Sequence, residues 1–273
     1  SETEGWDRTF SLPPGQNELI QRIAARNPKT IVAIEAGGAV DMTSWLDKVP
    51  AVIQTWYPGE MGGQALAQLL LGDANPSGHL PATFERRLQD NPTFANYYPA
   101  PGSMVVDYKE GIFVGYRGYE KNGTTPLFPF GYGLSYTTFK FSNLTVAPVA
   151  GVTVAAPSAT PAAAGPRWDV SLDVTNTGNR AGAAVPQVYV AEAQPKVARP
   201  AKELKGFAKV MLQPGETRRV TIPLDARSLA YYDVAGKRWK ADPGKFQVLV
   251  GASSADIQLK GELTLGKTIT LQP

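Results

Sequence analysis

Cysteine is absent from this chain of 273 residues, and the only histidine is His79. The lack of cysteine excludes a disulfide scaffold, a thiolate zinc site and a cysteine nucleophile. A multi-histidine metal centre is excluded too, and a Ser/His/Asp triad would have to use His79, around which no nucleophile pattern is found. We therefore expect His79 to be solvated or hydrogen-bonded, and acid/base chemistry to use carboxylates, tyrosine or lysine.

The chain also lacks a strong charge of one sign and a long apolar run. Its 27 Lys and Arg residues nearly balance 24 Asp and Glu residues without a basic cluster, which argues against nucleic-acid binding. No apolar stretch approaches the ~20 residues of a membrane span. The first residues have neither the basic start nor the apolar run of a signal peptide, and Met is missing, so we expect further sequence upstream. The cellular location is left open, and a periplasmic or secreted site is compatible with these features.

The chain has enough hydrophobic residues to form two hydrophobic cores. Hydrophobic residues make up 43% of it, and a length of 273 residues favours two compact domains of ~150 residues or fewer. The 27 glycines and 23 prolines indicate many tight turns and strands. The composition therefore predicts a folded protein with a large β component.

Short apolar segments alternate with helical patterns before residue 90. The expected order is a helix at 15–27, a buried strand at 31–34, a helical stretch at 43–47, a strand at 51–56, a helix ending at Gly72 and a last strand at 80–84. This alternation is typical of a parallel sheet with both faces covered. Three strands make a thin sheet, so we expect its remaining strands to lie upstream of Ser1.

The period changes to two after Tyr136. Short alternating segments at 170–174, 185–190, 207–212, 220–224, 246–250 and 257–265, separated by turn signals, predict a β-sandwich of the immunoglobulin or fibronectin type III shape. The stretch 147–166 is almost all small residues and proline, which predicts a flexible loop between the first two strands. The predicted division is an α/β part at 1–93, an aromatic, Gly- and Pro-rich connector at 94–135 and the β-sandwich at 136–273.

Several carboxylates could carry chemistry, and each has an ordinary structural alternative. Glu4 and Asp7 precede the first helix in an irregular segment that could present them, although Asp7 could equally pair with Arg8 or cap the helix. Glu35 ends the first strand, at the edge where open α/β sheets bind ligands. Glu60 precedes a helix, where a carboxylate simply favours the helix dipole. The residues alone do not choose among these candidates.

Whole phrases of the sequence resemble the C-terminal portion of glycoside hydrolase family 3 enzymes of the β-glucosidase and β-xylosidase type. The matching stretches occur in order along essentially the whole chain, at 4–8, 56–63, 72–81, 110–116, 126–139, 202–207, 212–217 and 243–246. The resemblance implies three parts: a (β/α)8 barrel, an α/β sandwich domain and a fibronectin type III-like domain. The fold class expected for this chain is therefore a partial α/β sandwich domain followed by a fibronectin type III-like β-sandwich.

The same resemblance implies a retaining mechanism with an Asp nucleophile from the barrel and a Glu acid/base from the second domain. The family phrase around that Glu matches residues 3–8, so the acid/base role falls on Glu4, and Trp6 beside it is expected to line the pocket on the aglycone side. The implied substrate is an oligosaccharide or other β-glycoside with terminal β-linked glucose or xylose. Two facing carboxylates hydrolyse such a bond without a metal or cofactor, so we expect neither.

One departure from the family pattern is large, since the chain holds neither a barrel nor the nucleophile phrase. A retaining enzyme needs two carboxylates, and this chain supplies one. We therefore expect it to be inactive alone and to require a barrel segment or a companion chain that carries the Asp nucleophile. The alternative is a non-catalytic carbohydrate-binding or assembly module that uses exposed aromatic stretches at 113–119 and 128–136.

Overall fold

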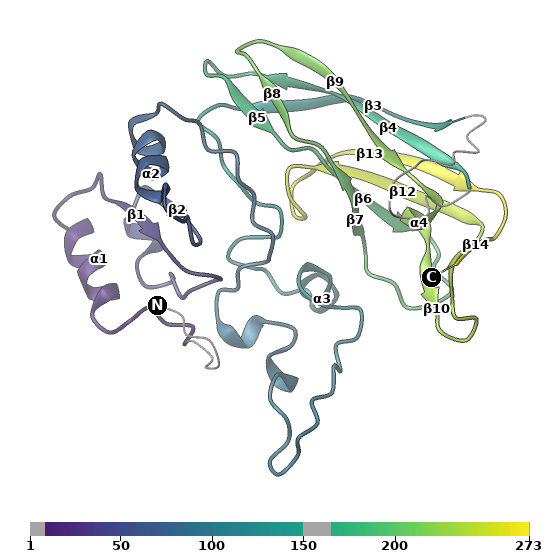
Figure 1. Ribbon diagram of the computed structural model, residues 1–273, viewed down its shortest axis with the longest axis horizontal. Helices are drawn as coiled ribbons and strands as arrows, with labels where there is room; N and C mark the ends of the chain where they lie inside the picture. Colours follow the sequence, from purple (N-terminus) through teal and green to yellow (C-terminus); the bar gives the residue numbers. More distant parts are fainter. Residues whose placement is uncertain (1–8, 150–164, 273) are drawn as a thin grey trace. The chain divides into compact units, whose positions relative to one another are not determined.

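The structure is a computed structural model that describes residues 9–149 and 165–272. It contains two compact units (Figure 1). The first, called the α/β unit, comprises Ser1–Ala74 and Pro81–Phe130; the second, called the β-sandwich unit, comprises Asn75–Leu80 and Gly131–Pro273. A short piece of the α/β sequence range thus packs with the β-sandwich.

The α/β unit is built around two parallel strands. Its elements are α1 (Gln16–Ala24), β1 (Ile31–Ile34), the 3-10 turn η1 (Leu46–Lys48), β2 (Ala51–Gln54), α2 (Gly62–Leu71), the 3-10 turns η2 (Leu88–Asp90) and η3 (Phe94–Asn96), and α3 (Tyr116–Asn122). β1 and β2 pair in register from Ile31↔Ala51 to Ile34↔Gln54. The expected parallel pairing of the two strands is therefore present, with β1 at the predicted residues and β2 shorter than predicted, but no α-helix connects them.

The helices of this unit follow from the sequence pattern, with one difference in burial. α2 ends where Gly72 adopts a left-handed conformation (φ 81°) and its N–H binds the carbonyl of Leu69, as the glycine predicted. The apolar stripe of α1 is only partly covered, because Leu19 is 56% exposed while Ala24 is buried. β1 likewise alternates, with Ile31 exposed and Val32 buried. Among the described residues the sheet is thus covered on one face, not on both.

Two expected elements of the α/β range are wrong. Residues 80–84 form no strand: Phe84 makes a single antiparallel bridge with Phe128, and its N–H donates to the Phe128 carbonyl at 2.8 Å. Pro81 interrupts this stretch and has no N–H to give to a ladder. The expected helical stretch at 43–47 is instead a turn followed by η1, which covers three residues.

The stretch after residue 93 has more structure than its sequence indicated. Besides η3 it contains α3, which begins after Gly115 (φ 57°) and ends at the left-handed Gly123 (φ 64°). Tyr119 on this helix is only 3% exposed, and Tyr116 stacks on Phe130 with ring centroids 4.9 Å apart. Much of the aromatic sequence expected to be exposed is therefore packed within the α/β unit itself.

The β-sandwich unit consists almost entirely of antiparallel strands. They are β3 (Phe139–Val149), β4 (Arg167–Asn176), β5 (Gly182–Ala184), β6 (Gln187–Glu192), β7 (Glu203–Phe207), β8 (Val210–Leu212), β9 (Thr217–Leu224), β10 (Tyr231–Asp233), β11 (Arg238–Ala241), β12 (Gly244–Gly251), β13 (Ile257–Leu265) and β14 (Ile269–Leu271), with the short helix α4 (Ala226–Leu229) after β9. The main sheets have the strand orders β3-β4-β9 and β13-β12-β6-β7, with smaller sheets β5-β8 and β10-β11-β14.

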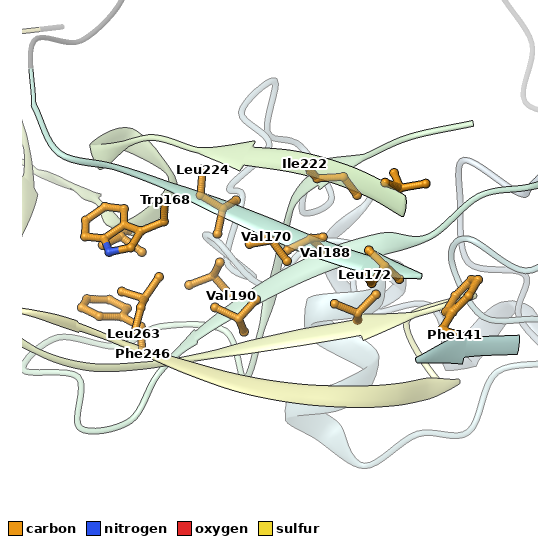
Figure 2. Close-up of a cluster of buried hydrophobic side chains, with 14 of the residues drawn as sticks. Phe141, Trp168, Val170, Leu172, Val188, Val190, Ile222, Leu224, Phe246 and Leu263 are labelled. Atoms are coloured by element: carbon orange, nitrogen blue, oxygen red, sulfur yellow. The ribbon is translucent and has the colours of Figure 1, made fainter. Parts of the chain in front are cut away.

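The core of this unit lies between the two main sheets, as Figure 2 shows. β4 alternates strictly, and its inward residues Val170, Leu172 and Val174 are fully buried. The ring of Phe246 and the side chain of Val188 close the core from the facing sheet (Figure 2). At ~25 cal/mol per Å² of apolar surface removed from water, this interior is the main favourable contribution to the stability of the unit.

Three expectations for the sandwich range need correction. The segment 207–212 is not one strand, because β7 ends at Phe207, pairs with β6, and is followed by β8, which pairs with β5. The strand expected from residue 185 begins at Gln187, after Pro186. β3 extends to Val149, so the first three residues of the expected loop 147–166 are strand; residues 150–164 lie outside the described part.

Asn75 fastens the short segment 75–80 to the β-sandwich unit. Its side-chain oxygen accepts hydrogen bonds from the Ser135 hydroxyl (3.0 Å) and the Tyr136 N–H (2.8 Å), and its nitrogen donates to the Ala181 carbonyl (2.8 Å). Further along, the Leu80 N–H donates to the Tyr132 carbonyl at 2.8 Å. One amide side chain thus joins three separate segments, which stabilises this junction.

Candidate active site

The two residues expected to act on the substrate, Glu4 and Trp6, lie outside the described residues, as do Asp7 and Arg8. The candidate site is therefore built from the rest of the α/β unit. Ligands of open parallel sheets bind beyond the carboxyl ends of the strands, so the ends of β1 and β2 are the place where a site is expected.

The carboxyl ends of β1 and β2 are joined by side-chain as well as backbone hydrogen bonds. The N–H and hydroxyl of Thr55 both donate to the Ile34 carbonyl at 2.9 Å, and the Gln54 side-chain nitrogen donates to the Ala36 carbonyl at 2.7 Å. Glu35 lies between these anchors and is exposed, so its carboxylate is available to solvent. The structure therefore places Glu35 at the predicted edge of the sheet. Hydrogen bonds to the carbonyls of Ile34 and Ala36 fix the backbone on both sides of Glu35.

Trp56 follows β2 in a backbone conformation that a bulky residue seldom adopts. Its φ is +55°, in the left-handed region. The indole packs edge-on against Phe84, with centroids 6.0 Å apart, and this contact helps hold the turn. The chain then runs through Tyr57, which is 61% exposed, into α2. Strain of this kind collects at ligand sites and turns, and no signal in the sequence of Trp56 predicted it.

The loop after β1 lies against the chain that leads into α1. The Asp41 N–H donates to the Phe10 carbonyl at 2.9 Å, and the Trp45 indole N–H donates to the Asn17 side-chain oxygen at 2.9 Å. The segment that precedes α1 and the loop that follows β1 therefore lie next to each other. Sequence reasoning missed both contacts; the Asp41-x-Thr43 spacing, which is typical of an Asx turn, was the available signal.

The other sequence candidates are not drawn to this edge. Glu60 is exposed in the turn before α2, a position in which a carboxylate favours the helix dipole. His79 belongs to the β-sandwich unit, where burial lowers its pKa below the usual value and Lys209 adds to that effect. The described residues contain no group of three His, Asp or Glu side chains that could hold a metal ion. No helix in the described ranges is long and apolar enough to cross a membrane.

Comparison with known proteins decides the family. The sequence profile described as "Glycosyl hydrolase family 3 C-terminal domain" matches residues 1–136, and that of a "Fibronectin type III-like domain" matches residues 184–254. The chain belongs to glycoside hydrolase family 3. Its match is to the C-terminal domain of that family, which confirms both the resemblance and the expected fold class of an α/β domain followed by a fibronectin type III-like sandwich.

The similar family 3 proteins are β-glucosidases. "Thermostable beta-glucosidase B" of Acetivibrio thermocellus is 42% identical over 275 residues, covering 99% of this chain and 34% of that protein. Among solved structures, the β-glucosidase of Kluyveromyces marxianus in complex with glucose has a TM-score of 0.87 and 40% identity, covering 99% of this chain and 31% of that one. β-Glucosidase 3B of Thermotoga neapolitana, in complex with α-D-glucose, has a TM-score of 0.86 and 36% identity, with coverages of 99% and 37%.

The chain thus spans about a third of the length of the family 3 relatives that it matches. The match of the C-terminal domain profile covers residues 1–136, so Glu4, Trp6, Glu35 and Trp56 all fall within the family 3 region of the sequence.

Proposed function

We propose that this chain is the part of a retaining β-glucosidase that supplies the acid/base carboxylate, Glu4, for hydrolysis of terminal β-linked glucose or xylose. The proposal is carried by the similarity of nearly the whole of this chain to about a third of each of several β-glucosidases, some of whose structures contain glucose. The phrase Thr3-Glu4-Gly5-Trp6-Asp7-Arg8 lies within the matched range and is the one that selects Glu4.

In this proposal Glu4 acts twice. In the first step its carboxyl group gives a proton to the glycosidic oxygen while the Asp nucleophile attacks the anomeric carbon, so the leaving group departs as an alcohol. In the second step the Glu4 carboxylate takes a proton from water, which attacks the glycosyl-enzyme and releases the sugar. Trp6 lines the aglycone side. The two carboxylates must stand ~5–5.5 Å apart, so their placement decides the rate.

The geometry of the α/β unit supports Glu4 over the other carboxylates. Phe10, six residues after Glu4 in the sequence, is hydrogen-bonded to Asp41 in the loop that follows β1, and ligands of parallel sheets bind beyond the carboxyl ends of the strands. Glu60 is exposed before α2, in a place that the helix dipole alone accounts for. Glu35 follows β1 and is exposed, but it lies outside the family phrase.

The nucleophile is proposed to come from a (β/α)8 barrel, either in the same protein or in a companion chain, and without it the chain is proposed to be inactive. Apolar side chains on the α/β unit support such a partner: Leu19, Ile23, Ile31, Leu70 and Leu71 are each at least 45% exposed. An exposed apolar set of this extent is typical of a surface that another part of a protein covers.

The proposed division of the chain into an α/β part, a connector and a β-sandwich remains 1–93, 94–135 and 136–273.

The leaving-group dependence of the Glu4→Gln variant tests the acid role. In the full-length protein, kcat/KM for methyl β-glucoside should fall by ~100- to 10,000-fold, because its alkoxide needs a proton to leave. For 2,4-dinitrophenyl β-glucoside, whose phenolate needs none, kcat/KM should change by less than tenfold, and azide should speed turnover by replacing base-assisted attack of water. Equal losses on both substrates would assign Glu4 to another role.

A non-catalytic carbohydrate-binding module is the second candidate function, and one observation favours it. Tyr97, Tyr98 and Tyr108 are 54%, 67% and 81% exposed, and Asn96 holds the two ends of their segment together through the Asp107 carbonyl and the Glu110 carboxylate. Exposed aromatic rings are suited to stacking on sugars. Mixing the chain with a barrel segment separates the candidates: activity on an aryl β-glucoside supports the glycosidase, and sugar binding without any restored activity supports the module.

A further inference from the structure

Helix α3 ends at the only asparagine of the sequence that is followed by glycine (Figure 1). Asn122 is the last residue of the helix and is exposed, and Gly123 follows it in the left-handed conformation (φ 64°). Nothing lies within 4 Å of the position that a Cβ of Gly123 would take. Three other asparagines, Asn27, Asn75 and Asn91, precede proline, which has no N–H. An unhindered backbone nitrogen therefore follows an exposed side-chain amide at the end of α3.

The backbone at this helix end is held by bonds that open easily. The Gly123 N–H donates to the Glu120 carbonyl at 3.3 Å, which is long for an N–H···O bond, and the Thr124 N–H donates to the Tyr119 carbonyl at 2.9 Å. Bonds in the last turn of an exposed helix end open at little cost in free energy. Opening matters because a helical backbone holds the Gly123 nitrogen away from the Asn122 side chain. Rotation about ψ of Asn122 then brings the nitrogen to the amide carbon.

We propose that Asn122 is a site of spontaneous deamidation, in which the Gly123 nitrogen attacks the side-chain amide carbon of Asn122. The new bond between this nitrogen and this carbon closes a succinimide ring. The nitrogen loses its proton to hydroxide, and the bond from the carbon to the amide group breaks, so that ammonia leaves. Water then opens the ring at either of its carbonyl carbons, which gives aspartate or isoaspartate. No atom is oxidised or reduced, and the reaction needs neither a substrate nor a barrel.

Both products change the end of α3. Each adds a carboxylate at the carbonyl end of the helix, where the helix dipole disfavours negative charge, and Glu120 lies two residues before it. Isoaspartate also adds a carbon atom to the backbone before Gly123, so the N–H groups of Gly123 and Thr124 shift relative to the carbonyls that they bind. Tyr119 in this turn is only 3% exposed, so loosening the turn disturbs a buried part of the α/β unit.

The test incubates the full-length protein at neutral and alkaline pH, digests it and separates the isomers of the α3 peptide before mass spectrometry. Two new peptides, one with aspartate and one with isoaspartate at position 122, should accumulate together. Their rate of formation should rise with pH, by about tenfold per unit, because only the deprotonated nitrogen attacks and its fraction rises in that proportion. Aspartate without isoaspartate would show direct hydrolysis by water and would overturn the attack by Gly123.

The same digest contains a matched internal control. Asn179 is also exposed and lies outside helices and strands, but Arg180 follows it, and the side chain of Arg180 hinders attack by the backbone nitrogen. Asn179 should remain intact while Asn122 converts, and Asn122→Gln should lose no ammonia at this position, because glutamine closes a larger ring far more slowly. Equal conversion of Asn122 and Asn179 would overturn the proposal.

Hydrogen exchange of the same peptide tests the effect on α3. In Asn122→Asp, which carries the charge of one product, the peptide should exchange faster than in Asn122→Gln, because the last turn opens more often. Equal exchange in the two variants would overturn the proposed loosening of the helix end.

Discussion

Arg199 shows at the scale of one residue how the β-sandwich unit tolerates buried charge. Its side chain is 6% exposed and lies between two carboxylates, with nitrogen–oxygen distances of 3.0 Å to Glu192 and 2.8 Å to Glu203. It also donates to the Leu229 carbonyl at 3.1 Å. Burial raises the pKa of Glu192 above its usual value despite the nearby guanidinium, so the desolvation of this network is substantial.

Replacing Arg199 with Met should therefore destabilise the unit strongly. The variant leaves the buried Glu192 carboxylate without the guanidinium and leaves Glu203 with only Lys205, 3.5 Å away. Breaking a buried pair in this way costs about 3–5 kcal/mol. Arg218→Met is the matched control, because the Arg218–Glu216 pair is much more exposed to solvent, which screens it, so its loss should destabilise the unit far less. Urea unfolding followed by circular dichroism measures both. Similar small losses in the two variants would show that the Arg199 network contributes little.

At the scale of elements, the sequence predicts those whose pattern is local. β1, β2, α2 with its Gly72 end, and β13 follow from apolar periodicity and a glycine, and the alternation of β4 predicts its buried face. Elements held by distant partners were missed, such as β14, which pairs with β11. The split of 207–212 into β7 and β8 was missed for the same reason, because a mostly apolar run, here with Lys209 in it, does not show where a chain changes sheets.

Two glycines of the α2 region should respond to alanine in opposite directions. Gly72 ends the helix with φ 81°, so Gly72→Ala should destabilise the α/β unit by about 1 kcal/mol. Gly63 lies inside α2 with nothing within 4 Å of the position that a Cβ would take, so Gly63→Ala should stabilise the unit by about 0.5–1 kcal/mol. Chemical unfolding of the two variants checks the signs. A stabilising effect at Gly72 would contradict the left-handed helix end.

At the scale of the whole molecule, the sequence predicts the candidate catalytic residue but not the contacts between distant segments around the candidate site. The phrase around Glu4 marks the acid/base candidate, and composition excludes thiol and multi-histidine chemistry. The hydrogen bond from Asp41 to Phe10 could not be predicted, because it joins backbone atoms 31 positions apart and leaves no mark in residue type. The same holds for the exposed apolar side chains, whose partner is proposed to be the remainder of a protein about three times as long.

The pH dependence of kcat/KM on an aryl β-glucoside, compared between the full-length protein and its Glu4→Gln variant, tests the central claim most directly. A general acid works only while protonated, so activity of the unmodified protein should fall as the pH rises above the pKa of its acid. In Glu4→Gln that alkaline fall should disappear, while the acid limb set by the nucleophile remains. An alkaline limb that persists unchanged in the variant would show that another group donates the proton.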